Sequence, residues 1–266
     1  MTFIHPTAII EDGAEIGEAC EIGAYCVIGS HVKLDSKVKL HSHVVVTGHT
    51  SIGEGTEIFP FSAIGKIPQD LKFEGEEARL EIGKYNRIRE HVTMNIGTKG
   101  GGMLTKIGDH GLFMAGSHIA HDSKIGNHVI FVNNSAVAGH CEVDDFAIIG
   151  GLSAIHQFVR IGRHAIVGGM TGVEKDVIPF GSVTGNRASL VGLNFTGLKR
   201  RGFDRETIAT MRKAYDMLFT EEAGNLETRT QHVAQHFSDS SEIQLIVNFI
   251  QAEASRGICM PAQDLK

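Results

Sequence analysis

The amino-acid sequence predicts an all-β solenoid plus a small α domain: a parallel β-helix of six-residue repeats, closed by C-terminal helices. Three observations support this fold class: an unbroken hexad pattern, an unusual composition and a change of period near Pro179. From Ile107 to Val173 a hydrophobic residue returns at every sixth position, and four residues after each one stands a small or β-branched residue. Three six-residue sides make an 18-residue triangular coil, which stacks ~4.8 Å from the next coil.

The composition suits short strands joined by tight corners. Of 266 residues, 42% are hydrophobic and 21% charged, which is enough for one extended domain and a small second one. Thirty-two glycines and no tryptophan are typical of neither a helical bundle nor a doubly wound sheet. The formal net charge of -6 argues against a general nucleic-acid binder.

The cysteines and the N-terminus indicate a soluble protein of a reducing compartment. No CxxC pair occurs, and Cys20, Cys26 and Cys141 all occupy the small position of their hexads, where packing explains them. The start MTFIHPTAII has no export pattern, and no apolar run is long enough to span a membrane. We therefore expect a cytoplasmic protein.

The same register begins at Ile4 and continues to Ile64, where the first of two breaks interrupts it. The segment 66–81 is charged and contains Pro68, and the segment NIGTKGGGMLTK, residues 95–106, contains three consecutive glycines. Both predict loops that leave the coil. Loops on a rigid scaffold are where binding residues concentrate.

Beyond Pro179 the hexads end, so we assign residues 1–190 to the β-helix and residues 191–266 to a C-terminal helical domain. Asp204 is placed to cap a helix with Ile208, Met211 and Leu218 on one face. Segments 226–237 and 242–254 predict two further helices. These helices would cover the strand edges at the end of the coil.

The 18-residue period converts sequence into rough geometry. It stacks His121, Gly139 and Gln157 in one column, with Asp122 and His140 in the neighbouring column. A histidine beside a carboxylate is a natural general base near neutral pH. His121 with Asp122 is therefore the candidate base.

Fifteen histidines occur, and each one alone is best explained as a surface residue, including His31, His110, His128 and His164. The coil period brings three histidines close together beside glycines, namely His118, His121 and His140. This grouping favours a functional site. No serine or cysteine lies in a nucleophile-elbow pattern such as GxSxG, so direct activation of a substrate hydroxyl fits better than an acyl-enzyme.

Two further features have open interpretations. Gly150, Gly151, Gly168 and Gly169 form a strip without side chains, against which a long ligand can lie. Six basic residues fall within residues 199–213, and this run is either a solvated helix face or a docking patch for phosphates or an acidic protein.

Several motifs resemble the UDP-N-acetylglucosamine O-acyltransferase family over essentially the whole chain. They are HIAHD at 118–122, VDDFAIIGG at 143–151, HQF at 156–158, QDLKFEGE at 69–76 and GLKRRGF at 197–203. The resemblance implies a left-handed parallel β-helix, a homotrimer with sites between neighbouring prisms, and no metal or other cofactor. It also implies transfer of a (3R)-3-hydroxyacyl group from acyl carrier protein to UDP-N-acetylglucosamine, the first step of lipid A synthesis.

The resemblance also assigns roles to individual residues, with His121 as the base and Asp122 as its partner. Gly169 matches the position that limits acyl-chain length, with Met170 beside it. If the basic run is a docking patch, its residues Arg205, Arg212 and Lys213 are the candidates for docking the acidic carrier protein. Positions that match contacts to the sugar nucleotide or acyl chain are Gln69, Asp70, Lys72, His118, Gly139, His140, His156, Gln157, Asn194, Arg200 and Arg201.

The chain departs from the family pattern at Asn95 and Ile96, where many members have His-Arg, and at Thr196, where an acidic residue is familiar. All three departures fall where contacts to the nucleotide sugar are expected. Transfer to a 3-amino analogue of the sugar, giving an amide, is therefore an alternative.

Two rival functions come from different classes. A hexapeptide carbonic anhydrase would hold zinc on His118, His121 and His140, but leaves the helical cap and the basic run unexplained. A purely structural β-solenoid would show regular rows of one residue type and no extruded loops, which does not match this irregular face.

Overall fold

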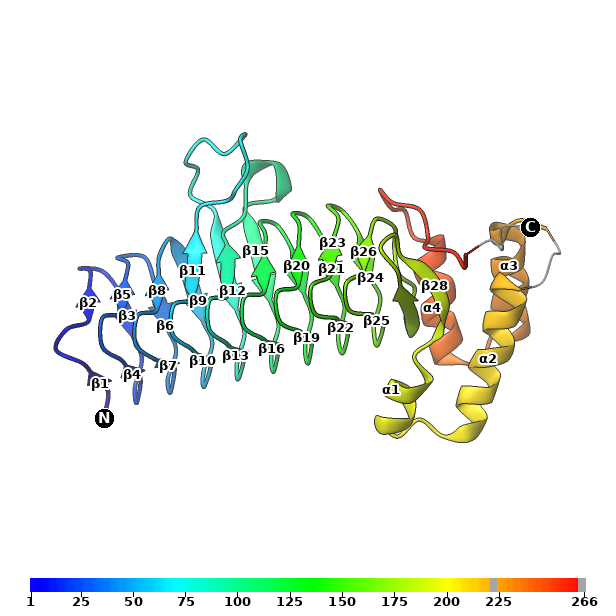
Figure 1. The fold of residues 1–266 in the computed structure, drawn as a ribbon, viewed down its shortest axis with the longest axis horizontal. Helices are drawn as coiled ribbons and strands as arrows, with labels where there is room; N and C mark the ends of the chain where they lie inside the picture. The colour runs from blue at the N-terminus through cyan, green and yellow to red at the C-terminus, as the bar shows by residue number, and fades with distance from the viewer. Residues whose placement is uncertain (221–223, 263–266) are drawn as a thin grey trace.

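The computed structural model describes residues 1–220 and 224–262, which form a long triangular prism with helices at one end (Figure 1). Each coil of the prism contributes one short strand to each of three sides. The N-terminus lies at the open end of the prism, and the helices cover the other end. Among the described helices, none combines the length and the hydrophobicity that crossing a membrane requires.

The three sides are three sheets in the described part of the chain, here named A, B and C. Strands within a sheet are parallel neighbours from successive coils, except the antiparallel pair β27 and β28. Sheet A contains β1 (Phe3–Ile4), β4 (Glu21–Ile22), β7 (Lys39–Leu40), β10 (Glu57–Ile58), β13 (Arg87–Ile88), β16 (Leu112–Phe113), β19 (Ile130–Phe131), β22 (Ile148–Ile149), β25 (Ile166–Val167), β27 (Gly181–Thr184) and β28 (Ser189–Leu193). Sheet B contains β2 (Ile9–Ile10), β5 (Val27–Ile28), β8 (Val45–Val46), β11 (Ala63–Lys66), β14 (Thr93–Asn95), β17 (His118–Ile119), β20 (Ala136–Val137), β23 (Ala154–Ile155) and β26 (Gly172–Val173). Sheet C contains β3 (Glu15–Ile16), β6 (Lys33–Leu34), β9 (His49–Ile52), β12 (Arg79–Ile82), β15 (Leu104–Ile107), β18 (Lys124–Ile125), β21 (Glu142–Val143) and β24 (Arg160–Ile161).

The hexad residues fill the interior, as the repeat predicts. From Ile22 to Val173 the large residue of every hexad is buried, and the small partners Cys20, Cys26 and Cys141 are buried beside them. Ile4 is 42% exposed because its coil is the first and has no neighbour above it. Burial of these apolar side chains along the axis stabilises the stacked coils.

The corners of the coils form three edges, named here by the sheets that they join. At most corners one residue adopts left-handed backbone, such as His140 at φ 61° and Phe158 at φ 65°. This conformation costs a non-glycine residue ~1–2 kcal/mol, which stacking between coils offsets in part. The rings of His140 and Phe158 stack with centroids 4.5 Å apart.

Both predicted loops leave the prism at the B–C edge, where they lie side by side (Figure 1). Loop one is residues 67–78, between β11 and β12, and loop two is residues 96–103, between β14 and β15. Loop two contains a short 3-10 helix, Lys99–Gly101. The Lys99 N–H donates to Glu76 Oε1 of loop one at 2.9 Å, so the loops are joined.

The helices at the C-terminal end are α1 (Phe195–Arg200), α2 (Arg205–Phe219), α3 (Leu226–His236) and α4 (Ser241–Gln251). Asp204 caps α2 as predicted, accepting from the Thr207 N–H at 2.7 Å. The last two helices end slightly earlier than expected, and α1 was not expected. Of the expected helical domain 191–266, residues 221–223 and 263–266 lie outside the described residues.

After α4 the chain returns to the prism, which the sequence did not predict. The Cys259 N–H donates to the Asp176 carbonyl at 2.8 Å, and the Asp176 N–H donates to the Gly257 carbonyl at 2.9 Å. This return segment, residues 252–262, therefore joins the helical cap to the last coils.

Candidate active site

The B–C edge brings together the two loops, HIAHD, HQF and the return segment. The columns predicted from the 18-residue period are present: Gly139 lies against His121, and Phe158 lies against His140. These positions fall at the same corner of successive coils because β17, β20 and β23 pair in register. One edge of the prism therefore carries most of the candidate residues.

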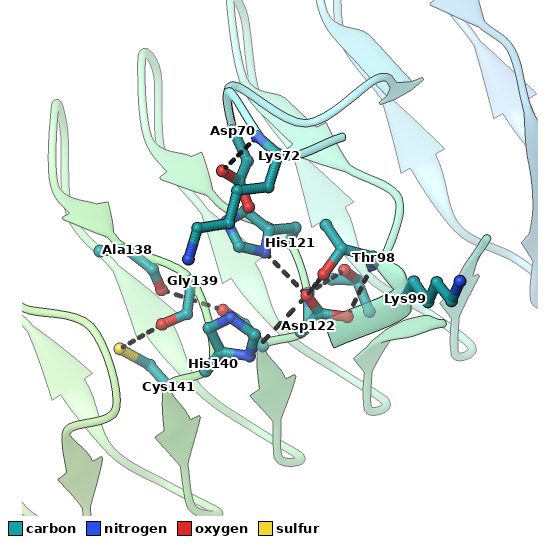
Figure 2. A network of polar contacts seen from close by, with 12 residues as sticks. Asp70, Lys72, Thr98, Lys99, His121, Asp122, Ala138, Gly139, His140 and Cys141 are labelled. Atoms are coloured by element: carbon teal, nitrogen blue, oxygen red, sulfur yellow. Dashed lines mark hydrogen bonds and ion pairs between the residues drawn. The ribbon is translucent and has the colours of Figure 1, made fainter. Parts of the chain in front are cut away.

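His121 and Asp122 form a buried dyad at the centre of this edge (Figure 2). Their side chains are joined by a 2.7 Å contact from His121 Nδ1 to Asp122 Oδ2, and the two residues are only 5% and 4% exposed. Because the Asp122 carboxylate accepts this hydrogen bond, Nδ1 of His121 carries the proton. Nε2 of His121 then keeps its lone pair, as a general base requires. Asp122 adopts left-handed backbone at φ 59°, which aspartate tolerates better than most residues.

Thr98 of loop two orients the carboxylate of Asp122, and the sequence did not identify it. The Thr98 N–H donates to Oδ1 at 2.8 Å and the Thr98 hydroxyl donates to Oδ2 at 2.6 Å. Gly97 and Gly101 lie so close to Asp122 that a side chain on either would overlap its carboxylate or the neighbouring backbone. The run of glycines was the available signal, since it permits such a close approach.

Two further histidines flank the dyad. The His140 ring meets the His121 ring edge-on at 5.0 Å, and its Nδ1 lies 3.8 Å from Asp122 Oδ2. His118 Nδ1 is hydrogen-bonded to Thr93 Oγ1 at 2.7 Å. Burial is the main cause that lowers the pKa of both His118 and His140, so both flanking rings are neutral near pH 7.

Within the described residues, His121, Asp122 and His140 are the group whose ligand atoms, within 4.8 Å of one another, suit a metal ion. The set differs from the three histidines of the carbonic anhydrase alternative, because His118 is not part of it. His121 Nδ1 and Asp122 Oδ2 are hydrogen-bonded to each other at 2.7 Å. This arrangement favours proton transfer by His121.

Cys141 is next to His140, and it is not suited to nucleophilic catalysis. Its Sγ faces the interior, 3.0 Å from the His156 carbonyl, and burial raises the pKa of the thiol to about 12. A thiol that stays protonated is a poor nucleophile. The described site therefore favours direct attack by a substrate hydroxyl over an acyl-enzyme.

Loop one brings Asp70 and Lys72 over the dyad. Figure 2 shows Asp70 beside the His121 ring and the Lys72 side chain reaching toward Gly139 and His140. Asp70 Oδ1 accepts from the Lys72 N–H at 3.0 Å, which shapes the loop. Gln69 is exposed on the same loop.

His156 and Gln157 lie further along the edge, where the return segment contacts them. Arg256 Nη2 donates to His156 Nδ1 at 2.9 Å, and Arg256 Nε donates to the Gln157 carbonyl at 3.0 Å. The sequence did not predict this arginine, since the return segment has no repeat. A pocket of about 490 Å³ lies beside it, lined by His140, Glu142, Phe158, Arg160, Glu253, Ala254 and Ser255.

The remaining candidates lie on other edges of the same prism. Asn194 is at the C–A edge, where its Oδ1 caps α1 through the Gly197 N–H at 3.0 Å and its Nδ2 donates to the His164 carbonyl at 3.1 Å. Gly169 and Met170 are at the A–B edge, between β25 and β26. A single chain thus does not gather all the predicted site residues.

The basic run of residues 199–213 divides into two parts. Arg201 turns toward the prism, where it donates to the Phe146 carbonyl at 3.0 Å and lies 5.2 Å from the ring centroid. Arg200, by contrast, is exposed on α1. The exposed basic side chains on α2 are those of Arg205, Arg212 and Lys213.

The departures from the family pattern have structural explanations. Asn95 is 4% exposed and its Nδ2 donates to the carbonyls of Lys66 and Ile67, at 3.3 and 3.1 Å. Ile96 is 5% exposed and packs in the core. Both therefore hold the base of loop one, and the expectation that they touch the sugar is not supported, whereas Thr196 is exposed on α1.

His164 was expected on the surface, and this expectation is wrong. It is 7% exposed, and its ring stacks between Phe146 and Phe180 at 4.7 and 5.5 Å. Phe203 from the cap covers the ring edge-on. Burial is the main cause that lowers the pKa of His164 to about 4.

A parallel β-helix of hexapeptide repeats with a buried His121–Asp122 dyad on one edge is typical of one class of protein, the hexapeptide-repeat acyltransferases. A family model described as "Udp N-acetylglucosamine O-acyltransferase; Domain 2" matches residues 176–259. The chain belongs to the UDP-N-acetylglucosamine O-acyltransferase family.

Full-length relatives support this membership. The chain is 64% identical over 260 residues to the acyl-[acyl-carrier-protein]–UDP-N-acetylglucosamine O-acyltransferase of Methylobacterium radiotolerans, covering 98% of this chain and 95% of that protein. It is 51% identical over 262 residues to the enzyme of the same name from Caulobacter vibrioides, covering 98% and 99%. A crystal structure of a UDP-N-acetylglucosamine acyltransferase superposes with a TM-score of 0.93 at 43% identity, covering 98% and 99%. The left-handed parallel β-helix with helical cap is thereby confirmed.

Proposed function

We propose that this protein transfers a (3R)-3-hydroxyacyl group from acyl carrier protein to the 3-hydroxyl of the glucosamine ring of UDP-N-acetylglucosamine, the first step of lipid A biosynthesis. The observation that carries the proposal is the His121–Asp122 dyad, which leaves Nε2 free as a base on an edge flanked by two loops. The substrates in the proposal are taken from the names of the relatives given above.

In the proposed reaction, His121 Nε2 removes the proton from the 3-hydroxyl as its oxygen attacks the thioester carbon. Asp122 stabilises the imidazolium that forms, and the neutral rings of His118 and His140 add no competing charge. When the tetrahedral intermediate collapses, the carbon–sulfur bond breaks and the imidazolium returns its proton to the thiolate leaving group. The step needs no metal or other cofactor.

The substrate contacts are assigned to the residues that the resemblance named. Asp70 and Lys72 of loop one, with Gln69, His118 and His140, surround the sugar at the dyad. His156 and Gln157 extend this surface toward the return segment, whose Arg256 holds them. Asn194, Arg200 and Arg201 contact the nucleotide from a neighbouring prism.

We further propose a homotrimer in which each site lies between two prisms. The predicted contacts are divided among three edges of one chain, and a closed ring of identical prisms can place different edges side by side. Residues 1–190 are proposed as the prism domain and residues 191–266 as the helical domain. A cytoplasmic location is supported by four cysteines that are all unpaired and buried, as in a reducing compartment.

The acyl chain is proposed to run along the prism toward Gly169. Gly169 lies 48 residues after His121, or about 2.7 coils of 18 residues, which is about 13 Å at ~4.8 Å per coil. Next to this bare position Leu152 and Met170 are 62% and 73% exposed, and they supply apolar surface for methylenes.

Carrier-protein docking is assigned to α2 and the helix before it. Arg205, Arg212 and Lys213 are exposed there, and Arg212 lies 4.6 Å over the Phe195 ring. A basic surface of this kind attracts an acidic partner at long range and raises the encounter rate.

The test is an acyl-transfer assay with UDP-N-acetylglucosamine and its 3-amino analogue as separate acceptors, and 3-hydroxyacyl carrier proteins of several lengths as donors. We expect an ester product from UDP-N-acetylglucosamine. An amide product alone would move the function to the amino analogue, and no transfer to either acceptor would overturn the proposal.

A further inference from the structure

Loop two does more than cover the site, because it supplies two of the groups that hold Asp122. The backbone N–H and the hydroxyl of Thr98 each donate to one oxygen of the carboxylate, at 2.8 and 2.6 Å. Thr98 is 5% exposed and Asp122 is 4% exposed, so water does not replace these bonds. Together they define the plane of the carboxylate.

We propose that Thr98 is a positioning residue for the His121–Asp122 dyad, and that Glu76 of loop one holds the segment that carries it. The proposal rests on the proposed function of the dyad. In it, loop one, which is expected to bind the sugar nucleotide, is joined to loop two, which fixes the geometry of the base.

Orientation matters here because Asp122 Oδ2 has more than one possible partner. It lies 2.7 Å from His121 Nδ1 but also 3.8 Å from His140 Nδ1. A carboxylate free to rotate could exchange the first partner for the second, and the His121 ring would then lose its orientation. The Thr98 hydroxyl, on the same oxygen, opposes that rotation.

Glu76 joins the two loops through its two carboxylate oxygens. Oε1 accepts from the Lys99 N–H at 2.9 Å, directly after Thr98, and Oε2 accepts from the Glu74 N–H at 2.9 Å. These backbone donors lower the pKa of Glu76, so it remains ionised near neutral pH. A movement of loop one would therefore be transmitted to Thr98 through this bond.

The first experiment uses Thr98→Val and Thr98→Ser. Valine has nearly the shape of threonine and keeps the N–H donor, but it removes the hydroxyl on Oδ2. We expect Thr98→Val to lower kcat by about 10- to 100-fold with little change in KM, and Thr98→Ser to stay within about threefold of wild type.

A double-mutant cycle separates positioning from a merely structural role. In an Asp122→Ala background there is no carboxylate to orient, so adding Thr98→Val should change the residual rate by less than about twofold. If the two losses instead multiply, Thr98 acts independently of Asp122 and the proposal is wrong. An unchanged kcat in Thr98→Val overturns it equally.

Glu76 is tested against its exposed neighbour Glu77, which is a matched carboxylate. Glu76→Ala should raise KM for the sugar nucleotide and also lower kcat, because it loosens both loops. Glu77→Ala should leave both constants near wild type. If the two variants behave alike, the bridge does not couple the loops.

One readout does not depend on transfer activity, so this inference and the proposed function can fail separately. The Nδ1 proton of His121 is followed by ¹H–¹⁵N NMR of histidine-labelled protein, with the signal assigned by its loss in His121→Ala. We expect the signal to shift or broaden in Thr98→Val and to persist in Thr98→Ser. An unchanged signal in Thr98→Val would show that the hydroxyl does not orient the dyad, whatever the substrates prove to be.

Discussion

Gly139 lies directly against the imidazole of His121: a Cβ added to Gly139 would stand 2.6 Å from Nε2 and 2.5 Å from Cε1. Such a distance is shorter than any van der Waals contact, and the ring would have to turn away. The absence of a side chain one coil beyond the base is therefore part of the site.

The first prediction follows from this contact. Gly139→Ala should reduce kcat by at least about tenfold by displacing the His121 ring, with thermal unfolding nearly unchanged. Gly257→Ala is the matched control, because nothing lies within 4 Å of its added Cβ. Full activity in Gly139→Ala would mean that the ring has room to adjust.

The second prediction concerns stability and pH at His164. Burial lowers its pKa to about 4 in the folded protein, whereas the unfolded value is about 6.5. Between these values the unfolded chain binds a proton that the folded chain does not. Stability is therefore fully present above about pH 6.5 and falls as the pH drops to about 4, by roughly 1–3 kcal/mol.

The variant that checks this is His164→Phe, measured by denaturant unfolding at pH 7 and pH 5. Its column neighbours Phe146 and Phe180 already adopt the same left-handed backbone, at φ 61° and 64°, so phenylalanine is compatible with the corner. The variant should lose less stability between pH 7 and pH 5 than wild type. An identical loss in both proteins would assign the pH dependence to other groups.

The third prediction tests docking of the carrier protein. Reversing Arg205 and Lys213 to Glu should raise the apparent KM for acyl carrier protein, and the effect should be larger at low ionic strength because salt screens surface charges. Reversing Lys33 and Lys37, at the far end of the prism, serves as the control. A KM that stays constant at every salt concentration would place docking elsewhere.

The fourth prediction concerns acyl-chain length. The wild type should prefer a longer donor, since each buried methylene contributes ~0.8 kcal/mol, or about fourfold in kcat/KM. Gly169→Met should reverse the preference. An added Cβ at Gly169 meets only the Gly151 carbonyl oxygen, at 3.4 Å, so the fold accepts a side chain there. If both proteins rank the donors alike, another residue limits the chain, with Met170 the nearest.

The hexads predicted the prism well because a repeated coil places equivalent residues in equivalent positions. Period 18 alone placed Gly139 against His121 and His140 beside Phe158. Both loops were also found, as interruptions of the period. The conformation of a loop has no period, however, so the hydrogen bonds from Thr98 to Asp122 could not be predicted from the sequence.

Other misses share this cause. Burial of His164 depends on Phe203, which arrives from the helical cap and not from the repeat. Arg256 reaches the HQF motif only because the chain returns after α4. Helix α1 is six residues long and includes Gly197, so neither its period nor its propensity was readable.

The most direct test of the account is the rate of acyl transfer to UDP-N-acetylglucosamine by wild type and by His121→Ala, with the folding of both proteins checked by thermal unfolding. We expect His121→Ala to fold normally and to lose about 10²- to 10⁴-fold in turnover, the usual effect of removing a general base. A folded His121→Ala protein that keeps more than a tenth of wild-type activity would contradict it.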